Sequence, residues 1–149
     1  MKVPESLQGL VQGLHHVAIA IEDLDAARVL YVDQLGMQAA QAEPEHVPGQ
    51  GVRVFVVLAG SQRIELLEPT GPETPVGKFL AKRGPGIHHL AFQVPDLQAA
   101  LDQLDAQGVR LVHRSPQPGS HNTSIAFLHP GGTGGVLMEL VQDPAIPAD

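Results

Sequence analysis

Two histidines and two glutamates recur at matching places in the chain, and their types suggest metal chemistry. The stretch LHHVAIAIEDLDAA at 14–27 returns as IHHLAFQVPDLQAA at 87–100, with seven of the fourteen aligned positions identical. Each copy closes on a similar segment, RIELL at 63–67 and LMELV at 137–141. Imidazole nitrogens and carboxylate oxygens are common ligands of divalent metals. The candidate ligands are therefore His16, Glu65, His89 and Glu139.

The alternation of side chains along a strand predicts on which face these residues lie. Val17 and its apolar neighbours should pack against the helix that follows, which turns His16 to the opposite face with two small alanines. The same reasoning turns Glu65, His89 and Glu139 away from the helices. Two carboxylates buried with two imidazoles would be costly without compensation. We therefore predict one divalent metal ion, with coordination positions left for water or substrate oxygens.

The other histidines have a simpler interpretation. His15 and His88 fall on the helix side of their strands, where we expect local hydrogen bonds and no metal binding. Three more histidines, for which we expect ordinary surface or structural roles, are His46, His113 and His129.

Hydrophobic periodicity in the first copy predicts a strand, a helix and three further strands. We expect the strands at 14–21, 37–42, 52–59 and 62–68, and a Pro/Gly-rich loop at 43–51. The helix should begin after an N-cap at Asp23 and end at Gly36. Its buried stripe should consist of Leu24, Ala27, Leu30, Tyr31 and Leu35.

The second copy repeats this order. A helix should run from the N-cap Asp96 to Gly108, and the strands are expected at 87–94, 109–114, 123–129 and 136–141. The predicted fold class is α+β, with two tandem βαβββ modules that form a curved mixed sheet around a metal-binding cleft. We expect a lead-in at 1–12 and a single domain at 13–149. Within that domain we place module 1 at about 13–69, a linker at 70–85, module 2 at about 86–142 and a frayed tail at 143–149.

Composition excludes several classes of function. A net charge of −7 argues against nucleic acid as a partner, because binding phosphates requires a basic face. No apolar run is long enough to predict a membrane span. The chain has no cysteine, so it offers no thiolate ligand or nucleophile. Its first residues lack the apolar stretch of a signal peptide, so we expect a cytoplasmic protein.

Longer segments are similar to those of a known family. HVAIAIEDLDAA at 16–27, IELLEP at 64–69, KFLAKRGPGIHHLAF at 78–92 and FLHPGGTGGVLMELVQ at 127–142 resemble the methylmalonyl-CoA epimerase family of the vicinal oxygen chelate superfamily. The resemblance implies metal ligands at His16, His89 and Glu139, with a fourth at Glu65. It also implies a homodimer whose substrate is methylmalonyl-CoA. The metal itself stays open among cobalt, manganese, zinc, nickel and magnesium.

The resemblance further implies an epimerase that interconverts (2R)- and (2S)-methylmalonyl-CoA by 1,1-proton transfer through a metal-stabilised enediolate. Glu139 would be both a metal ligand and one acid/base. The second acid/base is open, because Val54 stands where some family members carry a glutamate, and we consider Glu45, His121 or a bound water. Substrate contacts are expected at Lys82, Arg83 and His121, the first two because coenzyme A requires positive charge.

Three other functions fit the same fold. A glyoxalase I-like lactoylglutathione lyase also uses a metal and a glutamate acid/base, but the RGPGIHH and FLHP segments favour the epimerase. An extradiol dioxygenase requires two histidines and one carboxylate around iron. The second glutamate of this chain would then have no role, which makes this function less suitable. A resistance protein that sequesters small molecules needs no complete ligand set.

Overall fold

Strands β1 (Gly13–Ala20) and β6 (Gly86–Gln93) begin the two sequence copies. The computed structural model describes residues 10–147. These residues divide into two units: the first-copy unit, His16–His89, and the second-copy unit, formed by the described residues before His16 and after His89. Both β1 and β6 therefore pass from one unit into the other.

The strands of the first-copy unit follow the order β2 (Gln38–Ala39), β4 (Val52–Ala59), β5 (Gln62–Pro69) and β1. β3 (Glu45–Val47) also pairs with β4, in the antiparallel direction. β4 and β5 form a hairpin in which Ala59 lies opposite Gln62, so the turn consists of Gly60 and Ser61. Gly60 has φ +61°, a left-handed conformation that glycine adopts without strain. β5 and β1 run parallel, which makes the sheet mixed.

The first helix begins where the sequence predicts and then changes type. The Asp23 side chain accepts hydrogen bonds from the backbone N–H groups of Asp25 and Ala26, which starts α1 (Leu24–Arg28). A π-helical segment, Val29–Gln34, continues the chain as far as the turn at Gly36. Its wider turn changes which side chains face the sheet.

The predicted stripe is wrong at two positions, because Leu30 and Leu35 are 45% and 58% exposed. Tyr31 packs with the buried residues as predicted, and Val32, which the stripe did not include, does so too. Leu24 and Ala27, which precede the wider turn, are buried as predicted.

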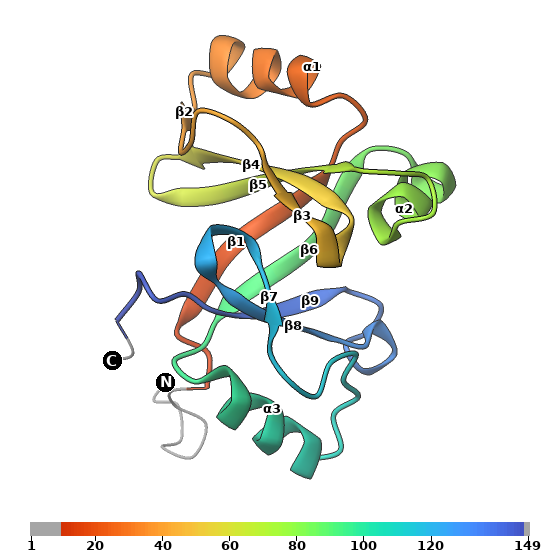
Figure 1. Ribbon diagram of the computed structural model, residues 1–149. Coiled ribbons are helices and arrows are strands. Elements are labelled where there is room, and N and C mark those ends of the chain that lie inside the picture. Colours follow the sequence, from red (N-terminus) through yellow and green to blue (C-terminus); the bar gives the residue numbers. More distant parts are fainter. Residues whose placement is uncertain (1–9, 148–149) are drawn as a thin grey trace. The chain divides into compact units, whose positions relative to one another are not determined.

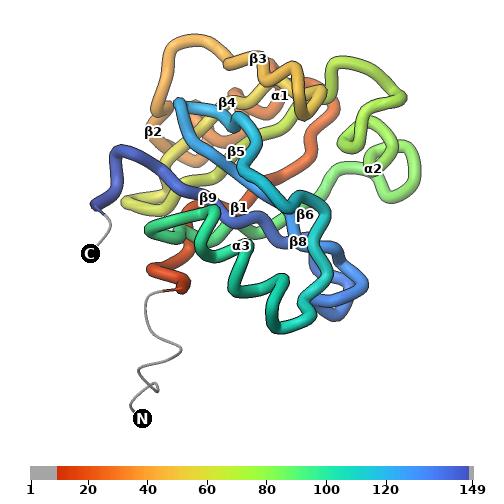
Figure 2. The backbone as a smooth tube through the Cα atoms, turned by 60° about the horizontal axis from the view of Figure 1, so that its bottom comes forward, coloured from red at the N-terminus to blue at the C-terminus, as the bar shows by residue number. Residues whose placement is uncertain are grey.

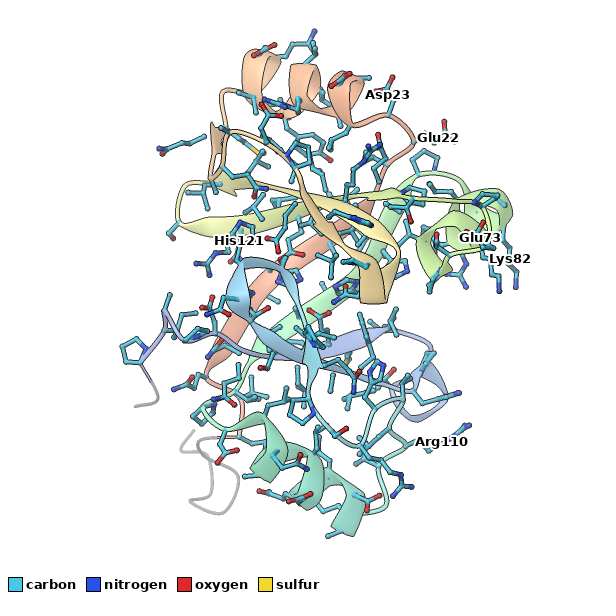
Figure 3. All side chains as sticks on the ribbon, viewed as in Figure 1. Glu22, Asp23, Glu73, Lys82, Arg110 and His121 are labelled. Carbon is cyan, nitrogen blue, oxygen red and sulfur yellow. The ribbon has the colours of Figure 1, made fainter. Side chains whose placement is uncertain are left out.

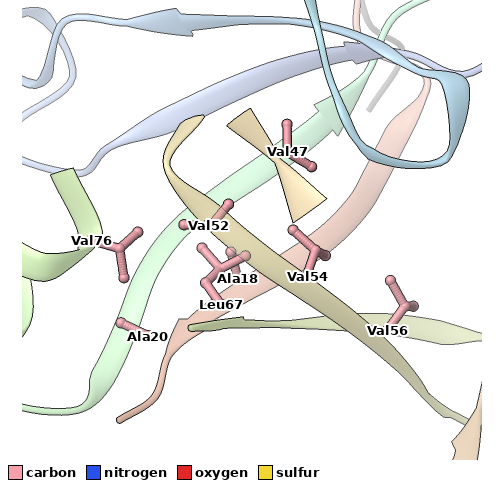
Figure 4. Close-up of a cluster of buried hydrophobic side chains, with 8 residues drawn as sticks. All are labelled: Ala18, Ala20, Val47, Val52, Val54, Val56, Leu67 and Val76. Carbon is pink, nitrogen blue, oxygen red and sulfur yellow. The ribbon is translucent and has the colours of Figure 1, made fainter. Parts of the chain in front are cut away.

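The two faces of this sheet bury different sets of residues. Ile19, Ile64 and Leu66 pack with the α1 side chains. On the opposite face, a second cluster contains Ala18 and Ala20 and extends to Val47 of β3 and Val76 of α2 (Pro75–Arg83) (Figure 4). The faces predicted for the two alanines and for Ile64 and Leu66 are confirmed. Val47 and Val76 cover the two alanines.

The strands of the second-copy unit follow the order β6, β9 (Met138–Gln142), β8 (Ser124–Leu128) and β7 (Gln117–Pro118). β6 pairs parallel with β9, and β9 pairs antiparallel with β8. α3 (Leu97–Ala106) begins at the N-cap Asp96, whose side chain accepts from the N–H of Ala99. It contacts β8 and β9 (Figures 1 and 2), and its buried residues pack against Leu140.

Two local predictions are wrong. Residues 109–114 form only an isolated bridge between Leu111 and Leu128, because the N–H groups of Val112 and His113 both donate to the carbonyl of Phe127. Two successive donors that share one acceptor form a bulge, which disrupts the ladder at this point. The predicted loop at 43–51 contains β3 and a 3₁₀ turn, Pro48–Gln50.

The tail is ordered where the structure describes it. Asp143 is 5% exposed, and the N–H of Ile146 donates to its carbonyl. The first residues of the predicted lead-in, 1–9, and the last two of the tail lie outside the described part. The fold is α+β. Among the described residues, no helix is long and apolar enough to span a membrane.

Candidate metal and acid–base site

His16 is the centre of a cluster on the first-copy unit. It lies on β1, on the same face as Ala18 and Ala20, and is 2% exposed. Its Nδ1 is 3.2 Å from Oε2 of Glu65, and its Nε2 is 3.4 Å from Nε2 of His89. The two rings meet edge to face, with their centroids 5.5 Å apart. Three of the four predicted ligands therefore lie together within one unit.

Glu65 reaches His16 from the neighbouring strand. On β5 it lies opposite Ala18 of β1 and Val56 of β4, and it is 7% exposed. Side chains of paired residues share a face of the sheet, so Glu65 is on the predicted face. A buried carboxylate beside an imidazole is the pairing that orients metal-binding histidines in many proteins.

His89 is held in its neutral form. Burial lowers its pKa from 6.5 to about 3. Its Nδ1 lies 2.9 Å from Nδ1 of the preceding His88, whose pKa is also lowered, to about 4, by burial and by the neighbouring His89. A neutral imidazole keeps a lone pair available, which is the form that binds a metal.

Glu139 lies on β9 of the second-copy unit, opposite Ala91 of β6 and Phe127 of β8. Ala91 is two residues beyond His89 on one strand, so Glu139 shares the face of β6 to which His89 belongs. The side chain is 3% exposed, and burial raises its pKa from 4.5 to about 8. A carboxyl group with such a pKa can take up and release protons near neutral pH.

The His16–His89 pair fits a metal ion. Two nitrogens bound to one tetrahedral ion at about 2.0–2.1 Å are about 3.3–3.4 Å apart. The two Nε2 atoms are 3.4 Å apart, so they could bind one cation without moving. The buried Glu65 carboxylate, which lies in the same unit, adds an oxygen donor of the kind that borderline divalent metals accept.

His15 has a partner that the sequence does not indicate. Its Nε2 is 2.7 Å from Oδ2 of Asp143, and both side chains are buried. The expected hydrogen bond exists, but it joins residues at opposite ends of the chain. The regular spacing of strands carries no signal for this pair, because Asp143 follows the last strand.

Glu45 lies within the predicted loop, but the structure places it on β3. It is opposite Val54 of β4 and half-buried. Val54 shares its face with Ala18, so Glu45 is on the face of the sheet that carries His16. The alternation of Glu45 and Val47 around an exposed His46 is the signal that could have predicted this short strand.

The predicted substrate contacts are exposed. Lys82 and Arg83 form the C-terminal end of α2, and the Arg83 guanidinium lies 5.7 Å from the centre of the Phe79 ring. His121 is part of the turn Ser120–Asn122 between β7 and β8 and has φ +55° (Figure 3). That left-handed backbone conformation is strained for a histidine, and such strain is common at ligand-binding positions.

Comparison with known proteins identifies the class. The sequence profile of the Glyoxalase/Bleomycin resistance protein/Dioxygenase superfamily matches residues 15–127. The chain belongs to this superfamily.

Individual relatives narrow the class to one family. The ethylmalonyl-CoA/methylmalonyl-CoA epimerase of Cereibacter sphaeroides is 40% identical, over 89% of this chain and 99% of its own length. The crystal structure of methylmalonyl-CoA epimerase from Mycobacterium tuberculosis is 41% identical, covers 96% of this chain and 93% of its own, and has a TM-score of 0.86. A methylmalonyl-CoA epimerase in complex with methylmalonyl-CoA and NH4+ is 36% identical, covers 94% and 99%, and has a TM-score of 0.85. The chain therefore belongs to the methylmalonyl-CoA epimerase family, a family of isomerases.

Proposed function

We propose that the protein interconverts (2R)- and (2S)-methylmalonyl-CoA by 1,1-proton transfer through an enediolate. The observation that carries the proposal is the buried cluster of His16, Glu65 and His89 on a chain 40% identical to an ethylmalonyl-CoA/methylmalonyl-CoA epimerase. The proton to be moved lies between a thioester and a carboxylate and is only weakly acidic in water. Its removal requires a base at the carbon and positive charge at the oxygens.

Four residues would hold one divalent cation: His16, Glu65, His89 and Glu139. The two histidines supply Nε2 atoms at a suitable separation, and Glu139 occupies the face of β6 on which His89 lies. The bound cation supplies charge that stabilises the enediolate as it forms. The Glu65 carboxylate, already beside Nδ1 of His16, either binds the cation directly or orients the imidazole.

Two carboxylates would exchange the proton from opposite sides of the carbon. Glu139 is one, because its raised pKa suits proton transfer near neutral pH. We propose Glu45 as the other. Glu45 on β3 and Glu65 on β5 belong to the two strands that flank β4, where they lie opposite Val54 and Val56. Both side chains are on the same face of the sheet. Positions so related are about 10–12 Å apart, so Glu45 lies near the cluster without belonging to it.

Coenzyme A would be bound by residues outside this cluster. Lys82 and Arg83 provide exposed positive charge for its phosphates, and His121 offers an imidazole on a strained turn. We expect a homodimer located in the cytoplasm, without nucleic acid or membrane partners.

Two assays test the proposal. The chain, stripped of metal with a chelator and then reloaded, should convert either epimer of methylmalonyl-CoA into the mixture, and the stripped protein should not. Lactoylglutathione formation from methylglyoxal and glutathione should be absent. A metal-dependent lyase activity without epimerisation would instead assign the glyoxalase chemistry, and tight ligand binding without turnover would indicate sequestration.

A further inference from the structure

The first histidine of the second His-His pair has no role in the chemistry above, yet it contacts a proposed ligand directly. Nδ1 of His88 lies 2.9 Å from Nδ1 of His89, a hydrogen-bonding distance. One of the two nitrogens must then carry the proton that the other accepts. The choice decides which nitrogen of His89 can bind a metal.

A metal bound at this site requires one of the two arrangements. If His89 donates from Nδ1, its Nε2 has no proton and keeps a free lone pair. That nitrogen is the one 3.4 Å from Nε2 of His16. If His88 donates instead, Nε2 of a neutral His89 carries a hydrogen and cannot bind a cation. Only the first arrangement is compatible with a metal shared by the two Nε2 atoms.

The position of His88 is itself fixed by α2. Its ring meets the Phe79 ring edge to face, with centroids 5.1 Å apart and an angle of 76° between the planes. Phe79 also packs against the cluster that contains Ala18 and Val76. The acceptor for His89 is therefore anchored to the core of the first-copy unit.

We propose that His88 is a positioning residue that fixes His89 in the Nδ1–H tautomer and so directs its Nε2 to the metal. The role rests on the metal site of the proposed function. It corresponds to the role that the Glu65 carboxylate can play toward Nδ1 of His16. Partners of this kind typically change metal affinity by about 10- to 100-fold when they are removed.

Two substitutions and a control separate positioning from a structural role. His88→Leu removes the acceptor, whereas His88→Asn keeps an oxygen near the place of Nδ1. His46→Asn is the matched control, because His46 is an exposed histidine on β3. Circular dichroism establishes that each variant is folded.

The tautomer of His89 is read in the metal-free protein from its ¹⁵N chemical shifts, and affinity is measured by titration with zinc. We expect the Nδ1–H form in the wild type, its loss in His88→Leu, and zinc binding about 10- to 100-fold weaker in that variant. His88→Asn should recover most of both properties, and His46→Asn should match the wild type.

Two results would overturn the positioning role alone: an Nε2–H tautomer in a wild type that binds zinc, or equal affinity in folded His88→Leu. A wild type that binds no divalent ion would overturn the proposed metal site, and the role of His88 with it. Zinc affinity of the wild type therefore distinguishes the two failures.

Discussion

The two copies share a motif but give its residues different partners. In the first copy, His15 pairs with Asp143 and His16 contacts Glu65. In the second copy the adjacent histidines, His88 and His89, contact each other. The same pair of residue types thus forms a buried hydrogen bond with a distant segment in one copy and a contact between adjacent imidazoles in the other. Position in the repeat predicts the ligand, whereas the surrounding fold determines its neighbours.

The largest expected effect comes from Glu139, the closing glutamate of the second copy. Glu139→Gln removes one proposed acid/base and should lower the rate of epimerisation, and of α-proton exchange from one of the two epimers, by about 10²- to 10⁴-fold. Glu65→Gln leaves an oxygen ligand and should cost much less, because Glu65 has no proposed role in proton transfer. Exchange is measured by NMR with saturating metal. Equal losses of activity in the two variants would contradict the proposal that Glu139, and not Glu65, transfers a proton.

The His15–Asp143 pair should matter for stability and little for chemistry. Asp143→Asn weakens a buried hydrogen bond to His15, and removing one partner of a buried polar pair costs about 1–3 kcal/mol. Urea denaturation measures the free energy of unfolding. The folded fraction should keep its zinc affinity, and His15→Asn should behave likewise. Loss of affinity without loss of stability in either variant would place this pair in the metal site.

Metal affinity should depend on pH because Glu139, in the second copy, must lose its proton when a cation binds. The pKa of Glu139 is raised to about 8, so the metal-free protein carries a proton there that a cation must displace. Affinity should therefore rise about tenfold per pH unit between roughly 6 and 8 and flatten above 8. His89, with a pKa of about 3, adds no competing proton in this range. Glu139→Gln should abolish the rise, and a rise that survives in this variant would assign the proton elsewhere.

The smallest effect concerns two side chains that bond to strand backbones. In the first copy, the Gln41 amide bonds to the carbonyl of Val54 and the N–H of Val56. In the second, Nδ1 of His113 accepts from the N–H of Phe127, and burial lowers the pKa of His113. Protonation below about pH 6.5 is therefore unfavourable in the folded state.

Acidification through pH 6.5 should remove about 1 kcal/mol or less of stability through His113 and none through Gln41. Comparing unfolding of the wild type with His113→Asn at pH 7.5 and 5.5 isolates this contribution. An identical pH dependence in both proteins would show that the bond does not depend on protonation.

Sequence reasoning succeeded where the signal is local. The faces of His16 and Glu65 follow from alternation on two strands, and the N-caps Asp23 and Asp96 follow from their positions before apolar runs. The π-helical segment, which exposes Leu30, is only six residues long, so the sequence carries no periodic pattern long enough to predict it.

Other features depend on contacts between distant residues. β3 is short and surrounded by prolines and glycines, so its pairing with β4 is decided by that neighbouring strand. The bond between His15 and Asp143 joins residues 128 positions apart in the sequence, a separation that no spacing rule predicts. His88 and His89 are adjacent in the sequence, but their side-chain contact requires an unusual orientation for neighbours on a strand.

The central claim is that two carboxylates exchange one proton with the help of a metal, and deuterium incorporation tests it most directly. Each epimer of methylmalonyl-CoA is incubated in deuterated water with metal-loaded wild type, Glu45→Gln or Glu139→Gln, and the α-proton is followed by NMR. The wild type should exchange both epimers, and a chelator should stop it. Each variant should exchange at most one epimer without inverting it, and the two variants should differ in which epimer that is. Metal-independent exchange, or normal inversion in both variants, would contradict the proposed mechanism.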